Sequence, residues 1–467
     1  METLVRYRDI EISMDKTAEY ILDVLADKGI EAYVVGGCVR DSILNDKYKL
    51  GVEINDWDIC TEARPEVVTN IFKNKGMRVI ETGLKHNTVT VLNKDGVGYE
   101  ITTFRTDGAS AYNKRTIGIG MASELMEDLS KRDFTMNAMA YNKKQGIIAV
   151  SGALQDIEDN VIRCVGDPYR RFQEDALRIV RAVRFAAKLG YSIDERTKQA
   201  MSKLKNSLSD VSGDRKASEL CKLLLGQYKL TALQEYMDIV FEIIPELKPL
   251  NGLDQQTRNH CYDAYKHTVV ATSSLTGCED IKVLLALLLH DTAKPETRVM
   301  GDDGNAHFYG HAGFGSFKAR EILNRMHFSK EIINDVCNLI TYHDNDFTNK
   351  MEIKVTLGKI GHSQFKRLLL VKRADILGKS EYAINKYISD VNTAEQLYRE
   401  IILEDAAFRV ADLDINGRDL IMLGYAPGSR LGDVLSELLR LVMNESVLNT
   451  REELVKYAKQ QLDEPVE

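Results

Sequence analysis

GGCVRD at residues 36–41 and DWDI at residues 56–59 decide the fold of this chain. The apolar residues 33–35 before the two glycines predict a buried strand, the glycines predict a tight turn, and the following residues predict a helix. Asp56 and Asp58 are two positions apart, so on a second strand both carboxylates point to one face of the sheet. This order of strand, glycine turn, helix and strand predicts an α/β domain.

The same residues have the chemistry of a nucleotide site. A glycine turn at a helix N-terminus offers backbone N–H groups to phosphate, and paired carboxylates bind Mg²⁺. Either feature alone is common, because most Gly-Gly pairs are plain turns and most Asp-x-Asp sequences are solvated loops. Together they predict nucleotidyl transfer, with a triphosphate held by the turn and Arg40 and with Mg²⁺ on Asp56 and Asp58. Glu100, on an expected neighbouring strand, is either a third carboxylate of the site or an ordinary strand-edge charge.

The composition is typical of a large enzyme. The length of 467 residues predicts about three domains. No apolar run approaches the roughly 20 residues that span a bilayer, so no membrane association is expected. The N-terminus shows no signal-peptide pattern and the seven cysteines include no Cys-x-x-Cys pair, which favours a cytoplasmic location. The net charge of −8 argues against non-specific nucleic-acid binding, although it allows a local basic groove.

Hydrophobic periodicity divides the chain into an α/β head and a helical remainder. A helix is expected over residues 4–25. Strands are expected at residues 33–35, 57–59, 88–92, 99–103 and 138–141. Strand signals nearly vanish after Gly152. The predicted fold class is therefore an α/β head, with a small mixed sheet and helices, followed by all-α domains.

Residues 167–189 are expected to form one helix that carries Asp175 and Arg178 on a common face. Ion pairs of this kind are common on helix surfaces. A selective role is the alternative, because Asp175 only accepts hydrogen bonds and Arg178 only donates them. That order suits the base-pairing edges of cytosine and adenine and opposes those of guanine and uracil. Each good bidentate contact discriminates by about 1–3 kcal/mol. Arg181 and Arg184 add positive charge suited to triphosphate or RNA.

Two further segments belong to the expected site in the head. Arg132 and Asp133, within LSKRDFTMNA at residues 129–138, either hold ribose or phosphate or form a salt bridge at the start of a strand. The polar loop at residues 106–120, which contains Lys114 and Arg115, is long for a strand connection. It is expected to be a mobile element of the active site.

Histidine and aspartate recur in order along the helical remainder. The residues are His267, His290, Asp291, His311, His343 and Asp375. Histidine and aspartate together suit divalent transition metals. A single histidine at a helix end is usually structural, but the ordered set predicts a second metal site.

The head motifs, taken in order, resemble those of class II tRNA nucleotidyltransferases, the CCA-adding enzymes, whose close relatives are bacterial poly(A) polymerases. The matching sequences are GGxxRD at residues 36–41, DxD at 56–58, KRDFTxNA at 131–138 and EDxxR at 174–178. Lys131 stands where the family usually has arginine. Residues 109–113 lack the acidic residue and the Arg-Pro pair expected in the family's flexible loop.

The resemblance implies roles for the matching residues. Asp56 and Asp58 become the metal ligands and the catalytic carboxylates, and Glu100 remains the candidate third carboxylate. The implied nucleotide-binding residues are Gly36, Gly37, Arg40, Arg132, Asp133, Asn137, Asp175, Arg178, Arg181 and Arg184.

The downstream histidines and aspartates resemble the HD superfamily of metal-dependent phosphohydrolases, which some bacterial CCA-adding enzymes carry. The resemblance implies an intact site for Mg²⁺ or a divalent transition metal, and a retained but inactive domain is the alternative. The implied domains are a head at residues 1–145, a neck and body at 146–255, an HD domain at 256–385 and a tRNA-binding tail at 386–467.

The expected function is CTP- and ATP-dependent addition or repair of the 3′-terminal CCA of tRNA without a nucleic-acid template. Alternatives in the same family are an A-adding enzyme, a CC-adding enzyme or a poly(A) polymerase. Alternatives from other classes are an HD phosphohydrolase with a nucleotide-binding head and an RNA-binding regulator with an inactive head. The intact Asp56–Asp58 pair argues against the regulator.

Overall fold

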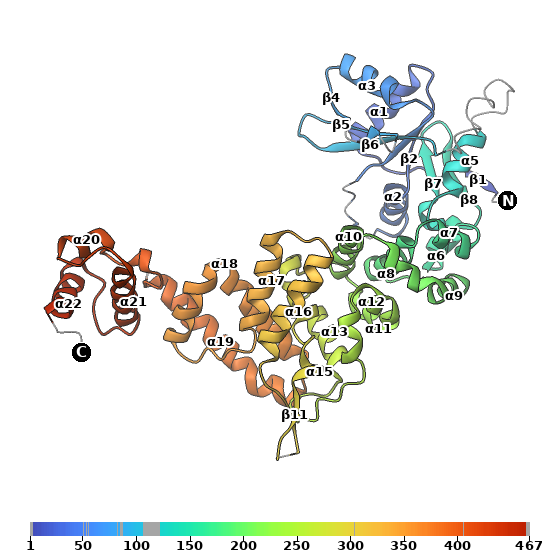
Figure 1. Cartoon of the computed structure of the whole chain (residues 1–467). Coiled ribbons are helices and arrows are strands. Elements are labelled where there is room, and N and C mark those ends of the chain that lie inside the picture. Colours follow the sequence, from blue (N-terminus) through green and yellow to red (C-terminus); the bar gives the residue numbers. More distant parts are fainter. Residues whose placement is uncertain are drawn as a thin grey trace. The chain divides into compact units, whose positions relative to one another are not determined.

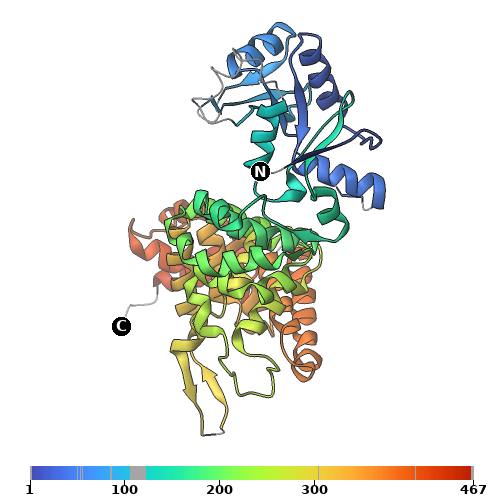
Figure 2. The ribbon, with the colours of Figure 1, turned by 90° about the vertical axis from the view of Figure 1, so that its right-hand side faces the viewer.

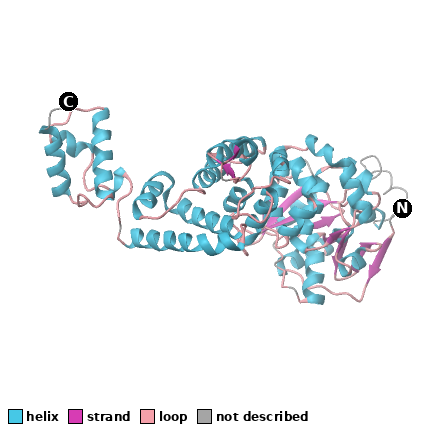
Figure 3. Ribbon diagram, turned by 90° about the horizontal axis from the view of Figure 1, so that it is seen from below, coloured by secondary structure: helices cyan, strands magenta, loops and turns pink. Residues whose placement is uncertain are grey.

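The computed structural model describes residues 3–49, 51–52, 54, 56–81, 83–84, 87–105, 122–302, 304–404 and 406–463. The chain forms two compact units that divide between Val211 and Ser212 (Figure 1). Most strands belong to the N-terminal unit, and the C-terminal unit is mainly helical (Figure 3). The loop expected at residues 106–120, including Lys114 and Arg115, lies outside the described residues.

The N-terminal unit is built on a mixed sheet, with eight strands in the described part of the chain. The strand order is β1-β8-β7-β2-β3-β6-β5-β4. Neighbouring strands run antiparallel except β3 and β6, which run parallel. The strands are β1 (Leu4–Tyr7), β2 (Ala32–Val35), β3 (Ile59–Thr61), β4 (Arg78–Ile80), β5 (Thr88–Leu92), β6 (Gly98–Thr103), β7 (Met139–Asn142) and β8 (Gly146–Val150). This sheet confirms the predicted α/β head.

The helix expected over residues 4–25 was wrong in its first half. Leu4 pairs with Val150 in the antiparallel ladder of β1 and β8. The helix α1 begins only after Asp15, whose carboxylate accepts hydrogen bonds from the backbone N–H groups of Thr17 and Ala18. A capping carboxylate fixes the start of a helix, and the residues before it are free to join a strand from a distant part of the chain.

The remaining elements of the N-terminal unit follow in chain order. The helices are α1 (Lys16–Ala26), α2 (Gly37–Tyr48), α3 (Pro65–Asn74), α5 (Ala122–Ser130), η2 (Thr135–Asn137), α6 (Ala153–Glu158), α7 (Pro168–Glu174), α8 (Leu177–Leu189), α9 (Glu195–Leu204) and η3 (Lys205–Asp210). Two short strands, β9 (Val161–Ile162) and β10 (Ser192–Ile193), pair in parallel.

The single helix expected at residues 167–189 was also wrong, because Asp175 separates α7 from α8. Its backbone is extended, with φ −155° and ψ 103°, and its carboxylate accepts a hydrogen bond from the backbone N–H of Leu177 at 3.2 Å. An aspartate side chain competes with the helix for backbone N–H groups in this way. Asp175 and Arg178 therefore do not share one helical face.

The C-terminal unit consists mainly of helices. They are α10 (Gly213–Leu224), α11 (Lys229–Glu235), α12 (Met237–Ile243), η4 (Pro245–Leu250), α13 (Ala264–Ser274), α14 (Ile281–Leu289), α15 (Lys294–Thr297), α16 (His311–Arg325), α17 (Lys330–Tyr342), α18 (Lys350–Leu377), α19 (Glu381–Leu403), η5 (Val410–Asp412), α20 (Gly417–Met422), α21 (Ser429–Met443) and α22 (Arg451–Asp463). A small antiparallel ribbon of β11 (Arg298–Met300) and β12 (Ala306–Phe308) interrupts them (yellow in Figure 2).

The helix α14 is the centre of this unit's core. Residues 283–289 are all fully buried, and α14 packs against α13, α17 and α18. A helix that is apolar all round must be covered on every side, so the polar pair that follows it, His290 and Asp291, is carried into the interior. The last three helices have an apolar cluster of their own, which includes Leu420, Leu438 and Leu454.

Of the helices in the described part of the chain, none combines the length and the apolar composition that a bilayer crossing requires.

Candidate active site and metal centre

The two aspartates of the head lie in extended chain directly before β3. Asp56 and Asp58 are exposed, whereas Trp57 and Ile59 are buried. The carbonyl of Asp58 accepts a hydrogen bond from the backbone N–H of Val35 at 2.9 Å, so the pairing of β3 with β2 extends to Asp58. The alternation places both carboxylates on one face, as the spacing predicts.

A third carboxylate lies on the neighbouring strand. Ile59 and Ile101 are partners in the parallel pair of β3 and β6, and Glu100 is exposed like Asp58. Loss of hydration around the Asp58 carboxyl raises its pKa to about 6; Glu100 and Asp56 add to the rise, and Arg132 and Arg105 oppose it. Neither aspartate has an ion-pair partner among the described residues. Oxygen ligands with unbalanced negative charge fit Mg²⁺.

Gly36 forms the turn between β2 and α2. Its φ of 81° and ψ of −127° favour glycine, and a Cβ atom there would lie 2.8 Å from Nη1 of Arg132. The close approach brings the guanidinium of Arg132 against the turn. Gly37 is the first residue of α2, the helix whose N-terminus was expected to face phosphate.

Arg40 is buried and engaged within the protein. Its Nε donates to the carboxylate of Asp41 at 2.8 Å, its Nη1 donates to the side-chain oxygen of Asn137, and its guanidinium lies 5.2 Å from the ring centre of Phe185. These contacts tie α2 to the segment that carries Arg132 and Asp133. A direct contact between Arg40 and triphosphate stays a prediction.

Arg132 and Asp133 both form ion pairs, and the sequence predicted neither pair. Arg132 pairs with the buried Asp128 at 3.1 Å, and Asp133 pairs with Arg181 at 2.7 Å. Burial would raise the pKa of Asp133, but Arg181 and a hydrogen bond from Asn137 lower it to about 2. Asp128 was missed as the partner of Arg132, although their spacing of four residues is typical of ion pairs on a helix. Nucleotide contacts from these residues stay predictions.

The segment around Asp175 is bonded to the head motif by backbone carbonyls. Nη2 of Arg178 donates to the carbonyl of Lys131 at 2.8 Å, and Nη1 of Arg171 donates to the carbonyl of Ser130 at 3.1 Å. Arg184 lies 3.9 Å from the ring centre of Phe185. The structure thus gives Arg178 a structural partner, and base selection by Asp175 and Arg178 stays a prediction.

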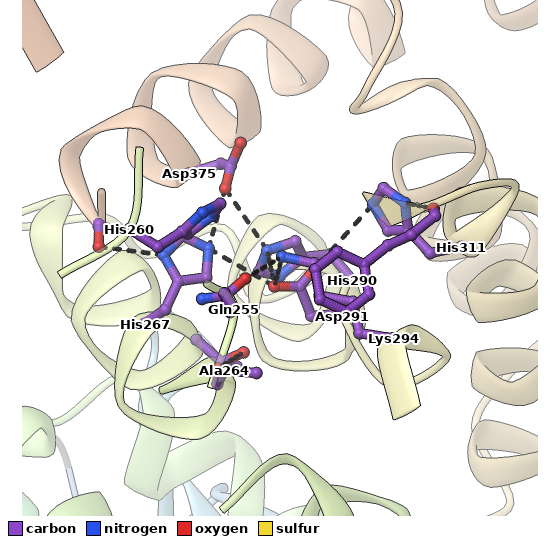
Figure 4. Close-up of polar contacts among 12 residues, drawn as sticks. Gln255, His260, Ala264, His267, His290, Asp291, Lys294, His311 and Asp375 are labelled. Carbon is purple, nitrogen blue, oxygen red and sulfur yellow. Dashed lines mark hydrogen bonds and ion pairs between the residues drawn. The ribbon is translucent and has the colours of Figure 1, made fainter. Parts of the chain in front are cut away.

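The six downstream residues converge in the interior of the C-terminal unit (Figure 4). His267 comes from α13, His290 and Asp291 follow α14, His311 begins α16, His343 follows α17 and Asp375 lies on α18. The Nε2 atoms of His267 and His290 lie 3.0 Å and 3.6 Å from Oδ1 of Asp375. The Nε2 atoms of His311 and His343 are 3.3 Å apart, and Oδ1 of Asp291 lies 3.9 Å from the former.

Backbone carbonyls orient the four imidazoles. In each ring Nδ1 donates to a carbonyl oxygen, so Nε2 is directed to the cluster as a lone-pair donor. The bonds are His267 to Gly378 at 3.0 Å, His290 to Leu287 at 2.7 Å, His311 to Phe308 at 2.9 Å and His343 to Ile340 at 2.6 Å.

The cluster has the electrostatics of a cation site. Nε2 of His267 and His290 and both oxygens of Asp291 are buried and make no hydrogen bond of good geometry among the described residues, although they have charged neighbours in ion-pair contact. Burial would lower the pKa of His290, but Asp291 and Asp375 raise it to about 10. A field that holds a proton on a buried imidazole will also hold a metal ion. Imidazole with carboxylate fits a divalent transition metal and also permits Mg²⁺.

A cavity of about 940 Å³ opens at this cluster and is lined by residues that sequence reasoning missed. Lys294 forms an ion pair with Asp291 at 2.8 Å and donates a hydrogen bond to Gln255 at 2.7 Å. Its position three residues after Asp291 was the available signal. His260 and Lys379 also line the cavity.

The comparisons with known proteins agree with this geometry. Residues 32–163 match the family model of the poly A polymerase head domain, residues 190–249 match the probable RNA and SrmB-binding site of polymerase A, and residues 306–458 match domain 2 of tRNA nucleotidyltransferases. The head fold and its paired carboxylates therefore define a nucleotidyltransferase.

Relatives that align with most of the chain identify the family within the nucleotidyltransferases. A CCA-adding enzyme of Lactobacillus helveticus is 32% identical over 94% of this chain and 95% of its own length, and one of Bacillus pumilus is 39% identical over 57% and 65%. The crystal structure of a Bacillus stearothermophilus CCA-adding enzyme in complex with CTP aligns with a TM-score of 0.69 at 27% identity, over 96% of this chain and 98% of that one. The chain belongs to the family of CCA-adding enzymes.

Proposed function

We propose that this protein adds or repairs the 3′-terminal CCA of tRNA, from CTP and ATP and without a nucleic-acid template. The observation that carries the proposal is the Asp56–Asp58 pair on one face beside Glu100, in a chain that aligns along almost its whole length with a CCA-adding enzyme. Related structures hold CTP in one case and tRNA in another, which supports the same substrates here.

In the proposed reaction the 3′-hydroxyl of tRNA attacks the α-phosphate of the nucleotide, and pyrophosphate leaves. Mg²⁺ at Asp56 and Asp58 supplies a lowered pKa for the hydroxyl and charge balance for the leaving group. The turn at Gly36 and Gly37 receives the triphosphate, and Glu100 adds its charge to the carboxylate face.

The remaining residues position the nucleotide. The hydrogen bond between Arg40 and Asn137 fixes the base of the nucleotide site. Arg132 and Asp133 orient the ribose. Asp175 and Arg178 face the base, and their donor–acceptor order accepts cytosine and adenine. Positive charge from Arg181 and Arg184 attracts the triphosphate or RNA.

One experiment separates full CCA addition from its alternatives. Transfer RNA that lacks its last three, two or one nucleotides is incubated with each nucleoside triphosphate singly, and product length is read. CTP should extend the first by two residues and the second by one, ATP should extend only the third, and GTP and UTP should extend none. A poly(A) polymerase gives a ladder with ATP on every substrate. An A-adding or a CC-adding enzyme uses only ATP or only CTP.

The cluster around Asp291 supports a second activity, hydrolysis of a phosphate ester, in an HD-type domain at residues 256–385. Its six side chains are His267, His290, Asp291, His311, His343 and Asp375. A divalent transition metal or Mg²⁺ held there would polarise the phosphoryl group and lower the pKa of water. The chain's own contribution is a preset direction for every imidazole.

A panel of divalent metals restored to chelated protein, with bis(p-nitrophenyl) phosphate and p-nitrophenyl phosphate as substrates, tests the second activity. Metal-dependent release of p-nitrophenol supports it. Stable metal binding without hydrolysis supports a retained but inactive domain.

The seven cysteines are all free thiols. That state is typical of a reducing compartment and supports a cytoplasmic location for the proposed reaction.

A further inference from the structure

His260 stands beside the buried cluster but belongs to neither of the ligand groups that the described residues form. Its ring packs edge-on against that of His267, with ring centres 5.2 Å apart. Both histidines lie on the same side of the cluster, opposite His311, in the view of Figure 4. His260 also lines the cavity of about 940 Å³ together with Asp291 and His311.

Hydrogen bonds from Ser380 and within the loop itself fix the loop that carries His260. The backbone N–H of Ser380 donates to the carbonyl of Asn259 at 2.8 Å, and its hydroxyl donates to the carbonyl of Arg258 at 2.8 Å. Within the loop, the hydroxyl of Thr257 lies 2.9 Å from Nδ1 of His260. The position of this imidazole is therefore built into the junction of α18 and α19.

The other ring nitrogen has no protein partner. Nε2 of His260 is buried and makes no hydrogen bond among the described residues. Leaving a buried polar atom unpaired destabilises a fold, so a bound ligand that pairs with Nε2 would be favoured. The Thr257 hydroxyl can donate to Nδ1, and in that tautomer Nε2 carries the hydrogen and has no acceptor among the described residues.

Three lysines that line the cavity are already engaged with protein oxygens. Lys294 bonds Asp291, Lys379 bonds Asp375 at 2.8 Å, and Lys372 bonds the carbonyl of His343 at 2.8 Å. Their charges offset those of the aspartates that line the same cavity, and their geometry is committed to the cluster. In the tautomer with the hydrogen on Nε2, His260 offers an uncommitted donor beside the metal ligands.

We propose that His260 is a substrate-contacting residue of this centre, whose Nε2–H donates to a non-bridging oxygen of a phosphate group held at the metal. The assignment rests on the proposed second activity for the identity of the anion. It does not depend on hydrolysis, because the same contact holds free phosphate.

Binding of inorganic phosphate to the metal-loaded full chain tests the assignment. Every protein carries Asp58→Ala, so that the head contributes no metal-held phosphate. Three further changes are compared by calorimetry, each with metal content measured in the same sample: His260→Phe, His260→Gln and Thr257→Val. Glutamine can return a donor to the place of Nε2, and valine removes the bond that fixes the ring.

His260→Phe should weaken phosphate binding by about 10- to 100-fold, the effect of losing one hydrogen bond to a charged group. Metal content and thermal unfolding should stay unchanged. His260→Gln should recover most of the affinity, and Thr257→Val should fall between the two. Unchanged affinity in His260→Phe overturns the assignment, as does loss of metal in that variant or failure of the parent protein to bind phosphate when loaded. If the contact is found and no phosphate ester is hydrolysed, the second activity fails while the role of His260 stands.

Discussion

The two candidate centres use aspartate in opposite surroundings. In the head, Asp56 and Asp58 are exposed at the end of extended chain, and no cation of the described residues pairs with them. In the C-terminal unit, Asp291 is 1% exposed and lies among four imidazoles and Lys294. An open carboxylate pair suits ions that arrive and leave with a triphosphate. A closed, oriented set suits a resident ion.

The pKa values of Asp58 and Asp291 shift in opposite directions because their charged neighbours differ. The pKa of Asp58 is raised to about 6 because its carboxyl loses hydration near other carboxylates. Burial acts the same way on Asp291, but His290 and Lys294 hold its pKa well below the ordinary value. The cluster thus contains close countercharges, whereas in the head Arg132 and Arg105 offset the rise at Asp58 only in part.

The largest expected effect comes from a substitution that disrupts only the exposed carboxylate site of the head. Asp58→Ala should abolish nucleotide addition and leave tRNA affinity nearly unchanged, because metal ligands act on the reaction step and RNA affinity comes from distributed basic contacts. Single-turnover CMP incorporation and filter binding measure the two quantities. Asp95→Ala, an exposed turn residue of the head, is the matched control. Measurable incorporation by Asp58→Ala at ordinary Mg²⁺ would contradict the assignment.

The closed centre should be separable from the open one. Asp291→Ala should reduce any metal-dependent ester hydrolysis to background and spare CCA addition, because the ion pairs of the removed carboxylate are with other ligands of the cluster and with Lys294. Both activities are assayed on one preparation. Asp390→Ala, an exposed residue that lines the same cavity, should leave both unchanged. Loss of nucleotide addition in a folded Asp291→Ala protein with normal tRNA affinity would show that the centres are coupled.

Base choice gives the next effect in size. Arg178→Ala should weaken discrimination of CTP and ATP against UTP and GTP by about 1–3 kcal/mol, or roughly 5- to 150-fold, if one bidentate contact is lost. Incorporation of all four nucleotides on truncated tRNA measures it. Arg170→Ala is the control. It removes an exposed arginine that, like Arg178, pairs with Glu174. If Arg178→Ala lowers thermal stability but keeps the C and A preference, its bond to the carbonyl of Lys131 is its whole role.

The smallest effect concerns stability. The pKa of Asp133 is depressed to about 2, so its ion pair with Arg181 stabilises the fold above the unfolded pKa near 4 and loses that effect as pH falls through about 2. Asp133→Asn should therefore lower the free energy of unfolding by about 2 kcal/mol at pH 7. The difference should stay constant down to about pH 5 and shrink below pH 4. Urea unfolding followed by fluorescence of Trp57, the single tryptophan, reports on the head.

Asp167→Asn is the control for that measurement. Its ion pair with Arg196 is exposed on both sides and should contribute less than about 1 kcal/mol. Equal losses in the two variants would mean that burial of the Asp133 pair adds nothing.

The sequence predicted those features of the fold that depend only on residues close together in the chain. The glycine turn, the one-sided carboxylates and the strands at residues 88–92 and 99–103 are encoded within a few positions of each other. Pairing of Leu4 with Val150 depends on residues far apart in the chain. The break at Asp175 required a choice between two local bonding patterns that the sequence leaves open.

The same limit applies to the sites. Histidines and aspartates in the right order indicated the downstream cluster, because each residue type is itself a ligand. Lys294 and His260 were missed because lysine and a lone histidine gain meaning only from the atoms around them. The fourfold use of backbone carbonyls was equally invisible, since every residue type has one.

That last feature bears on how the cluster tolerates mutation. The acceptors that aim the four imidazoles belong to the main chain at Leu287, Phe308, Ile340 and Gly378. Replacing a side chain at the first three positions leaves the acceptor in place, so sequence drift there need not turn a histidine away. Gly378 differs, because a Cβ atom would come within 3.0 Å of His267 and Ala271. Across distant relatives, a cluster built this way should keep its geometry while most of the residues that supply its acceptors change.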